Sequence, residues 1–224
     1  MKVVICADAH LDSPFSMFNR SDVNLSIRHQ EQRQAFSKAI DEVKRIGAEL
    51  LLIPGDLFDG RKASMATVKF LTDAFESIPG TYVVISPGNH DYCDGQSPWL
   101  KELWPENVHI FKSSRIESVA IPELDCRVYG AGFESMDCPA LLEGFRAEQT
   151  EKYAIGLFHG DPAAANSNYN PITVQQVKAS NLDYLALGHI HKADKFTAGK
   201  TLCAWPGCPM GKGYDEPGEK GVYI

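Results

Sequence analysis

The sequence predicts an α/β protein in which two packed, mixed β-sheets are flanked by α-helices. Two observations lead to this class. Strand-like and helix-like stretches alternate over residues 2–86, an order typical of parallel strands joined by crossover helices. From residue 107 onward, short apolar runs follow one another with little helix between them, which indicates a meander or a second sheet. The length of 224 residues suits one domain spanning residues 1–224.

The first half of the chain carries the alternating pattern. Residues 2–7 contain a short apolar run that predicts a buried strand. Apolar residues recur at three- and four-residue spacing from about Ser26 to Ile46, and Gly47 is a natural C-cap for this amphipathic helix. The remaining elements of this half are expected to be a strand, a helix and a strand, at residues 50–53, 63–77 and 81–86.

Short strands dominate the second half. A short helix is expected near residues 99–103, and further helices over 137–147 and 173–180. A polar, Asn-rich loop over residues 161–171 is long enough to be functional or mobile. Strands are expected over residues 107–111, 115–121, 125–131, 153–158, 183–187, 193–198 and 201–205.

Composition limits the class of protein. The formal net charge of -7 argues against a broad basic face that tracks a nucleic-acid backbone, although a metal centre can still attract phosphates through its own cations. The six cysteines show no metal-finger spacing. We find no signal peptide and no apolar stretch near the ~20 residues that span a bilayer. The expected protein is therefore cytoplasmic, reduced and not bound to a membrane.

Five predicted strands end in polar residues of one kind. Ligands of α/β sheets usually bind at the carboxyl ends of the strands, so these strand tips are the expected site. Carboxylate and amide oxygens mixed with imidazoles suit a pair of transition-metal ions better than Mg²⁺ or Ca²⁺. The residues at the tips are Asp8, His10, Asp56, Asn89, His90, His159, His189 and His191.

These tips resemble the motifs of the calcineurin-like metallophosphoesterases, which run DxH, GDxxD, GNHD, H and GHxH. All five are present in family order, as Asp8-Ala9-His10, Gly55-Asp56-Leu57-Phe58-Asp59, Gly88-Asn89-His90-Asp91, His159 and Gly188-His189-Ile190-His191. The resemblance implies a four-layer sandwich of two mixed sheets and outer helices. It also implies that the protein binds two divalent metal ions. Mn²⁺ is the expected metal, and Fe and Zn are the alternatives.

The resemblance also assigns roles to the residues. One metal ion would bind Asp8, His10, Asp56 and His191, and the other Asp56, Asn89, His159 and His189. Asp56 would bridge the two ions, and a hydroxide between them would be the nucleophile. His90 is expected to act as general acid or to stabilise the leaving group.

Asp59 and Asp91 are candidates to orient His90 or a metal ligand, and a turn or capping carboxylate is the alternative for both. We expect Phe15 and Tyr92 to pack under loops rather than to stack on bases.

A narrower resemblance points to the SbcD-type DNA-repair exonuclease branch. It is carried by the loop His10-Leu11-Asp12-Ser13-Pro14-Phe15 and by residues 205–222, where Cys208 occupies a position that is usually Ser. It implies a phosphodiester substrate, with DNA preferred. Members of that branch continue into a DNA-capping domain and a segment that binds an SbcC-type ATPase, whereas this sequence ends with the phosphoesterase domain, which argues against that partner.

Two alternatives to the nuclease are open. A phosphodiesterase or phosphatase for small molecules or nucleotides is favoured by the acidic composition and the missing cap. A non-catalytic scaffold with this fold is the other; it predicts lost ligands, and none of the eight positions is lost.

Overall fold

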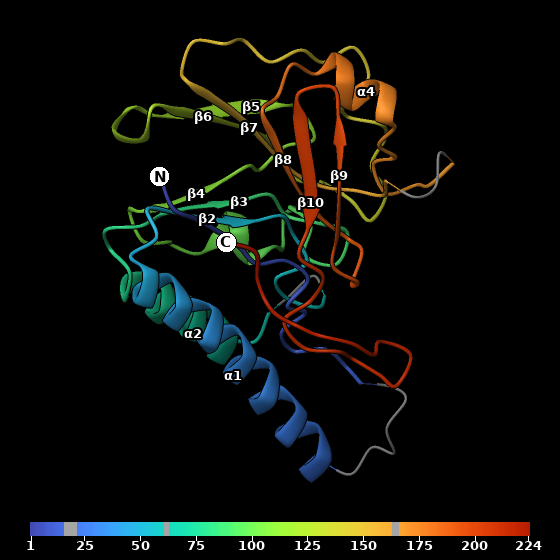
Figure 1. Ribbon diagram of the computed structural model, residues 1–224. Coiled ribbons are helices and arrows are strands. Elements are labelled where there is room, and N and C mark those ends of the chain that lie inside the picture. The colour runs from blue at the N-terminus through green and yellow to red at the C-terminus, as the bar shows by residue number, and fades with distance from the viewer. Residues whose placement is uncertain (16–21, 61–62, 163–165) are drawn as a thin grey trace.

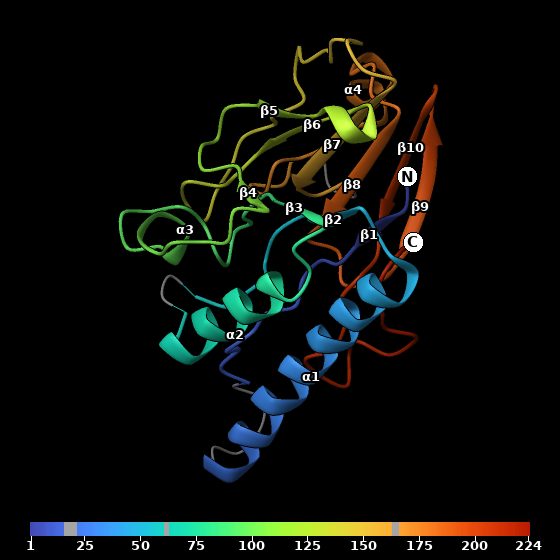
Figure 2. The same ribbon diagram turned by 90° about the vertical axis from the view of Figure 1, so that its left-hand side faces the viewer.

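The computed structural model describes residues 1–15, 22–60, 63–162 and 166–224. It has the four layers expected of the sandwich (Figure 1). Helices α1 (Asp22–Ile46) and α2 (Met65–Glu76) cover one sheet, and α4 (Val174–Ala179) lies on the far side of the other. Figure 2 shows α1 and α2 lying against the same layer, with the last segment of the chain returning beside α1.

The first sheet contains four strands in the order β1-β2-β3-β4, all parallel. It is therefore parallel rather than mixed within its named strands, and an isolated antiparallel bridge between Ile5 and Tyr223 adds to its β1 edge. The strands are β1 (Val3–Ile5), β2 (Leu50–Ile53), β3 (Tyr82–Ile85) and β4 (Val108–Ile110). The expected strand at 107–111 thus belongs to this sheet and not to a meander, because its backbone pairs with the free edge of β3.

The second sheet is mixed, with six strands in the order β5-β6-β7-β8-β10-β9. The pairs β5–β6 and β9–β10 are antiparallel, and the central strands are parallel. Two short helices, α3 (Pro98–Lys101) and the 3₁₀ turn Pro122–Leu124, lie in connections. The strands are β5 (Glu117–Ile121), β6 (Cys126–Ala131), β7 (Tyr153–His159), β8 (Tyr184–Gly188), β9 (Asp194–Ala198) and β10 (Thr201–Trp205).

The helix expected over 137–147 is absent, and that prediction was wrong. Residues 141–144 form a turn, and Gly144 has a φ of +71°, which ends helical geometry. Two backbone N–H groups of this stretch bond to a neighbouring loop: Cys138 donates to the Asn168 carbonyl, and Leu141 to the Asn170 side chain. Leu142 is nevertheless buried under the second sheet, so an apolar residue of this stretch reaches the core from a turn.

Strand β2 shows how the layers are held together. Its side chains alternate between the two faces of the sheet. Leu50 and Leu52 contact the second sheet, whereas Leu51 and Ile53 belong to the core formed with α1 and α2. All four are fully buried, and each contributes roughly 1.5–3 kcal/mol of burial free energy.

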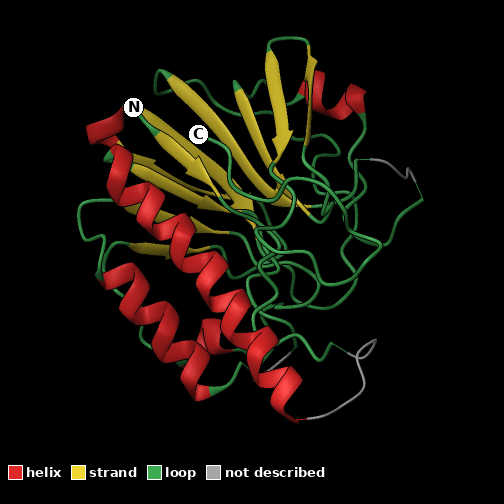
Figure 3. Cartoon of the chain, turned by 60° about the horizontal axis from the view of Figure 1, so that its bottom comes forward, coloured by secondary structure: helices red, strands yellow, loops and turns green. Residues whose placement is uncertain are grey.

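The loops that follow the strands gather at one end of the sandwich, as Figure 3 shows. Because parallel strands end on the same side, the polar residues after β1, β2, β3, β7 and β8 are brought to one place. Gly47 ends α1 with a φ of +61°, as expected, so the chain can turn directly into β2. Among the described residues, every helix is too short or too polar to cross a bilayer.

Candidate metal centre

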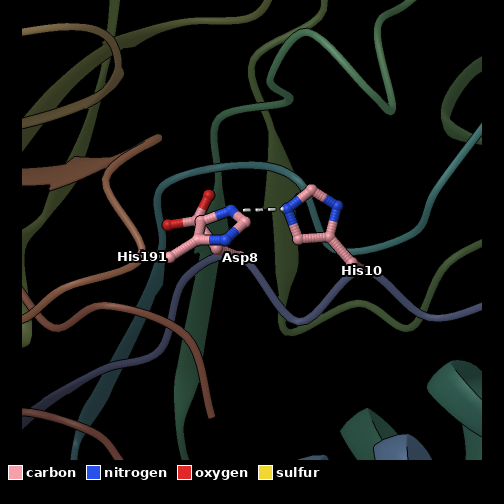
Figure 4. A group of neighbouring side chains, drawn as sticks. All are labelled: Asp8, His10 and His191. Carbon is pink, nitrogen blue, oxygen red and sulfur yellow. Dashed lines mark hydrogen bonds between the residues drawn. The ribbon is translucent and has the colours of Figure 1, made fainter. Parts of the chain in front are cut away.

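Three residues from the ends of β1 and β8 form the first part of the site. Asp8, His10 and His191 offer ligand atoms that all lie within 4.8 Å of one another. The two imidazoles point toward each other (Figure 4), and their Nε2 atoms are 3.0 Å apart. The Asp8 carboxylate accepts from the backbone N–H of His189 at 3.0 Å, which ties the β1 loop to the β8 loop.

The second part comes from the ends of β3, β7 and β8. His159 Nε2 lies 2.8 Å from Asn89 Oδ1 and 3.3 Å from His189 Nδ1. The other ring nitrogen of His159, Nδ1, lies 3.0 Å from the Pro54 carbonyl oxygen. That carbonyl accepts a hydrogen bond from Nδ1–H, so the lone pair of His159 is on Nε2, facing Asn89 and His189.

Asp56, after β2, lies between these two parts. Its Oδ2 is 3.7 Å from His10 Nε2 and 3.5 Å from His159 Nε2. Its Oδ1 accepts from the backbone N–H of His90 at 2.9 Å. One carboxylate oxygen thus faces both histidine groups, the position that a bridging ligand requires.

The backbone at the tips is strained. Asp8, His10, Asp56 and His189 have φ values of +53°, +46°, +51° and +95°, a region that side-chain-bearing residues rarely adopt. Such strain costs of order 1–3 kcal/mol per residue and is concentrated at functional sites. Gly188 shows how tightly the loops pack, since a Cβ there would collide with the Pro54 carbonyl oxygen.

The electrostatics of the cluster fit bound cations. Asp8 and Asp56 are both buried, and burial, followed by repulsion from Asp56, raises the pKa of Asp8 well above its usual value. Burial lowers the pKa of His10 and His159 and takes that of His189 to about 4, so the imidazoles are neutral. Buried carboxylates beside neutral imidazoles are metal ligands by type. The residues present therefore fit divalent metal ions.

His90 and Asp59 form a pair at the edge of the cluster. His90 Nδ1 donates to Asp59 Oδ1 at 2.7 Å, and Asp59 also accepts from the Ser13 hydroxyl at 2.9 Å. The hydrogen bond to Asp59 raises the pKa of His90, and it helps to lower that of Asp59 against the effect of burial. The His90 side chain is 38% exposed, whereas His10 and His159 are buried. A ring nitrogen of His90 also lies within 4.8 Å of ligand atoms of His10 and Asp56.

Asp91 supports the backbone of the site. Its carboxylate accepts from the N–H groups of Asp56 at 3.1 Å, Leu57 at 2.9 Å and Gly88 at 2.6 Å. It is fully buried, and burial raises its pKa to about 7. The side chain thus joins the β2 and β3 tips by their backbones. Asp91 was expected to orient either His90 or a metal ligand. Its hydrogen bonds go to the backbone of the Asp56 loop and not to the His90 ring, so they favour the second role.

The sequence assigned no role to three further residues that hydrogen-bond to histidines of the cluster. Gln32, on α1, donates to the His10 carbonyl at 2.6 Å. Asn170 donates to the His159 carbonyl at 2.9 Å. Glu216 lies 2.5 Å from His191 Nδ1. In a single sequence, nothing marks a buried glutamine on a helix or an asparagine in a polar loop as part of a site. Glu216 lies in the segment 205–222 that resembles the SbcD-type branch, but the sequence does not show that it contacts His191.

The comparisons with known proteins agree with this geometry. A model of the calcineurin-like phosphoesterase family matches residues 1–193. The chain belongs to that family. The family's fold of two sheets flanked by helices is the one observed, and the buried carboxylates and imidazoles fit the divalent metal ions of a metallophosphoesterase.

Individual relatives give the extent of the likeness. The chain is 33% identical over 227 residues to the uncharacterized metallophosphoesterase YhaO of Bacillus subtilis (strain 168), and the match covers 97% of this chain and 55% of that protein. The chain thus spans about half the length of this curated relative.

Two solved structures share the fold. The first is TT1561 of Thermus thermophilus, with a TM-score of 0.57, 14% identity and 92% and 89% coverage of this chain and that one. The second is a putative 5'-nucleotidase from Staphylococcus aureus, with a TM-score of 0.53, 13% identity and 92% and 48% coverage.

Proposed function

We propose that this chain is a two-metal phosphodiester hydrolase that acts on DNA as a nuclease of the SbcD-like type. The observation that carries the proposal is the position of Asp56 Oδ2, 3.7 Å from His10 Nε2 and 3.5 Å from His159 Nε2. One carboxylate oxygen lies near an imidazole of each of the two groups, which is the arrangement that a two-metal centre needs.

In this proposal each group of residues binds one metal ion, and Asp56 is a ligand of both ions. Asp8, His10 and His191 would hold one ion with Asp56, and Asn89, His159 and His189 the other. When bound, the two ions activate water and polarise the phosphoryl oxygens. Mn²⁺ is our first choice, with Fe or Zn as alternatives, because the donors mix nitrogen and oxygen.

His90 is proposed to protonate the leaving oxygen of the phosphodiester. Asp59 accepts a hydrogen bond from its Nδ1 at 2.7 Å, which leaves Nε2 to hold the proton that is donated. The same hydrogen bond raises the pKa of His90, so the ring stays protonated to a higher pH than a free imidazole. A group with these properties, beside the ligands and partly open to solvent, is suited to general acid catalysis.

The case for DNA rests on two loops. The loop over residues 10–15 and the segment over 205–222 carry the resemblance to the SbcD-type branch, and they lie together in the structure. They line a cavity of about 250 Å³ beside the site, to which Ser13, Asp59 and Lys212 contribute. The Lys212 ammonium lies 3.9 Å from Asp59 Oδ2, so this cavity contains a cation of the kind that pairs with phosphates.

A small phosphodiester or nucleotide is the second candidate. The chain has a net charge of -7, and the same cavity is lined by Asp59, Asp215 and Glu216. Carboxylates on that side disfavour a long polyanion.

We further propose that the chain forms a single domain and lies in a reducing cytoplasm, a location that six free, buried cysteines support.

The test is a substrate panel with Mn²⁺. Purified protein is assayed on linear and circular single-stranded DNA, duplex DNA, nucleotides and bis(p-nitrophenyl) phosphate. We expect linear DNA to be degraded and circular DNA to be spared, as an exonuclease requires. Brisk turnover of the small esters with intact DNA would replace this proposal with the second candidate.

His90→Ala tests the acid in the same assay. The variant should keep its metal content and lose about 10²- to 10⁴-fold in turnover of DNA. His109→Gln, a change in the edge strand β4, is the control for loss of a histidine. Near-normal turnover by His90→Ala would remove His90 from the mechanism.

A further inference from the structure

We propose that Glu216 is a positioning residue that orients the His191 imidazole and so sets the affinity of the metal ion that His191 would bind. This inference rests on the proposed function, because it assigns His191 as a ligand. It concerns the segment after β10, which lies beyond the residues 1–193 that the family model matches.

The contact between the two side chains is short and direct. Glu216 Oε1 lies 2.5 Å from His191 Nδ1. The other carboxylate oxygen, Oε2, accepts from the backbone N–H of Lys212 at 2.8 Å and from the Cys208 thiol at 3.7 Å. Both oxygens are engaged, so the carboxylate is held in one orientation and the imidazole with it.

The hydrogen bond selects one tautomer of His191. A carboxylate accepts, so the proton of the neutral ring lies on Nδ1 and the lone pair on Nε2. His191 Nε2 is the atom that faces His10 Nε2 at 3.0 Å, beside Asp8. A carboxylate on the far nitrogen of a ligating histidine fixes the ring and makes it more basic.

The segment that carries Glu216 is built against the His191 loop. The backbone N–H of Cys208 and the Lys220 ammonium donate to the His191 carbonyl, at 3.4 and 3.3 Å. Gly207 has a φ of +74°, and a Cβ there would lie 2.7 Å from that same carbonyl oxygen. At the other end, Arg28 of α1 donates to the Gly211 carbonyl at 3.0 Å. These contacts fix the segment on both sides of Glu216, and so they fix the position of Glu216 next to His191.

A competing assignment makes Glu216 a ligand itself. His191, Cys208 and Glu216 offer donor atoms within 4.8 Å of one another, enough for a separate metal ion. Both Glu216 oxygens, however, already accept from N–H groups and a thiol. Satisfied acceptors favour the positioning role, and the experiment below separates the two.

The experiment compares Glu216→Ala and Glu216→Gln with the wild type. Mn²⁺ binding is followed by calorimetry and by elemental analysis after dialysis. The tautomer of His191 is read from ¹⁵N shifts of the metal-free protein, assigned with His191→Gln. Glu219→Ala changes an exposed glutamate of the same segment and is the matched control.

We expect Glu216→Ala to bind one of two Mn²⁺ ions about 10- to 100-fold more weakly and to lose the Nδ1–H tautomer. Glu216→Gln should lie between it and the wild type, because its amide oxygen still accepts a hydrogen bond without the charge. Because this substitution is nearly isosteric, it keeps the test valid if Glu216→Ala fails to fold. Glu219→Ala should match the wild type in both measurements.

Two results would overturn the inference. One is metal affinity within twofold of the wild type in both Glu216 variants, with the tautomer unchanged. The other is a third bound ion in the wild type that Cys208→Ser and Glu216→Gln both remove. Failure of the wild type to cleave any phosphodiester would instead refute the proposed function, and the tautomer measurement, which needs no metal and no turnover, would still decide the role of Glu216.

Discussion

The pair of His90 and Asp59 allows the proposed acid to be tested through the pH dependence of the reaction. In Asp59→Asn the side chain keeps its size but loses its charge, so the 2.7 Å hydrogen bond to His90 Nδ1 no longer favours the imidazolium. The pKa of His90, which that bond raises, should fall. A general acid must be protonated to act, so activity should be lost at a lower pH than in the wild type.

The size of the effect follows from the contact. A hydrogen bond to a charged group contributes about 1.5–3 kcal/mol when buried. The Asp59 side chain is 13% exposed and that of His90 is 38% exposed, so screening by solvent reduces this to about 1 kcal/mol. That corresponds to roughly a fivefold loss of kcat/KM on the alkaline side of the profile, with little change on the acid side.

The assay is kcat/KM for a phosphodiester from pH 6 to 10, together with metal content. Asp137→Asn, which changes an exposed carboxylate, is the control and should superimpose on the wild type. In a His90→Ala background, Asp59→Asn should have no further effect on the alkaline limb. Coincident alkaline limbs for Asp59→Asn and the wild type would show that Asp59 does not act through His90.

Two further predictions concern carboxylates of the cluster. Asp56→Ala should reduce the binding of both metal ions together, because its Oδ2 faces both His10 and His159; elemental analysis showing one ion retained at full occupancy would argue against a bridge. Burial raises the pKa of Asp91 from 3.8 to about 7, so between these pH values the folded wild type keeps a proton that the unfolded chain has released, and the stability of the wild type falls as pH rises. In chelator, Asp91→Asn should therefore gain stability relative to the wild type as pH rises from about 4 to about 7 and gain no more above that. Urea unfolding at several pH values measures the gap, and a gap independent of pH would refute the reasoning.

Local patterns predicted most of the elements. An apolar run of four to seven residues followed by a polar tip is visible along the chain, and the strand at residues 50–53 was expected at the bounds observed. The helix ending at Ile46 was visible from its spacing and from Gly47. The prediction of a helix over 137–147 was wrong, because an apolar side chain such as that of Leu142 can be buried when its backbone forms a turn as well as when it forms a helix.

The placement of β4 was not visible in its own residues. Val108–Ile110 pairs with β3 in the parallel sheet, and the sequence of a three-residue strand does not show which strand it pairs with.

Asp91 was expected to support the site, but the backbone amides that it joins lie up to 35 residues away in the chain. Contacts of this kind depend on how loops meet after the sheets have formed.

The sequence by itself determined the fold class, the family motifs and the eight residues at the strand tips, since each depends on neighbours within a few positions. The family resemblance also implied that Asp56 bridges the two groups of ligands, whereas only the tertiary structure decided that Glu216 contacts His191. The reason is physical: a strand and its tip are specified by local hydrophobicity and turn residues. The contact of Glu216 with His191, 25 residues apart, instead requires the segment after β10 to fold back onto the His191 loop, where Cys208 and Lys220 donate to the His191 carbonyl.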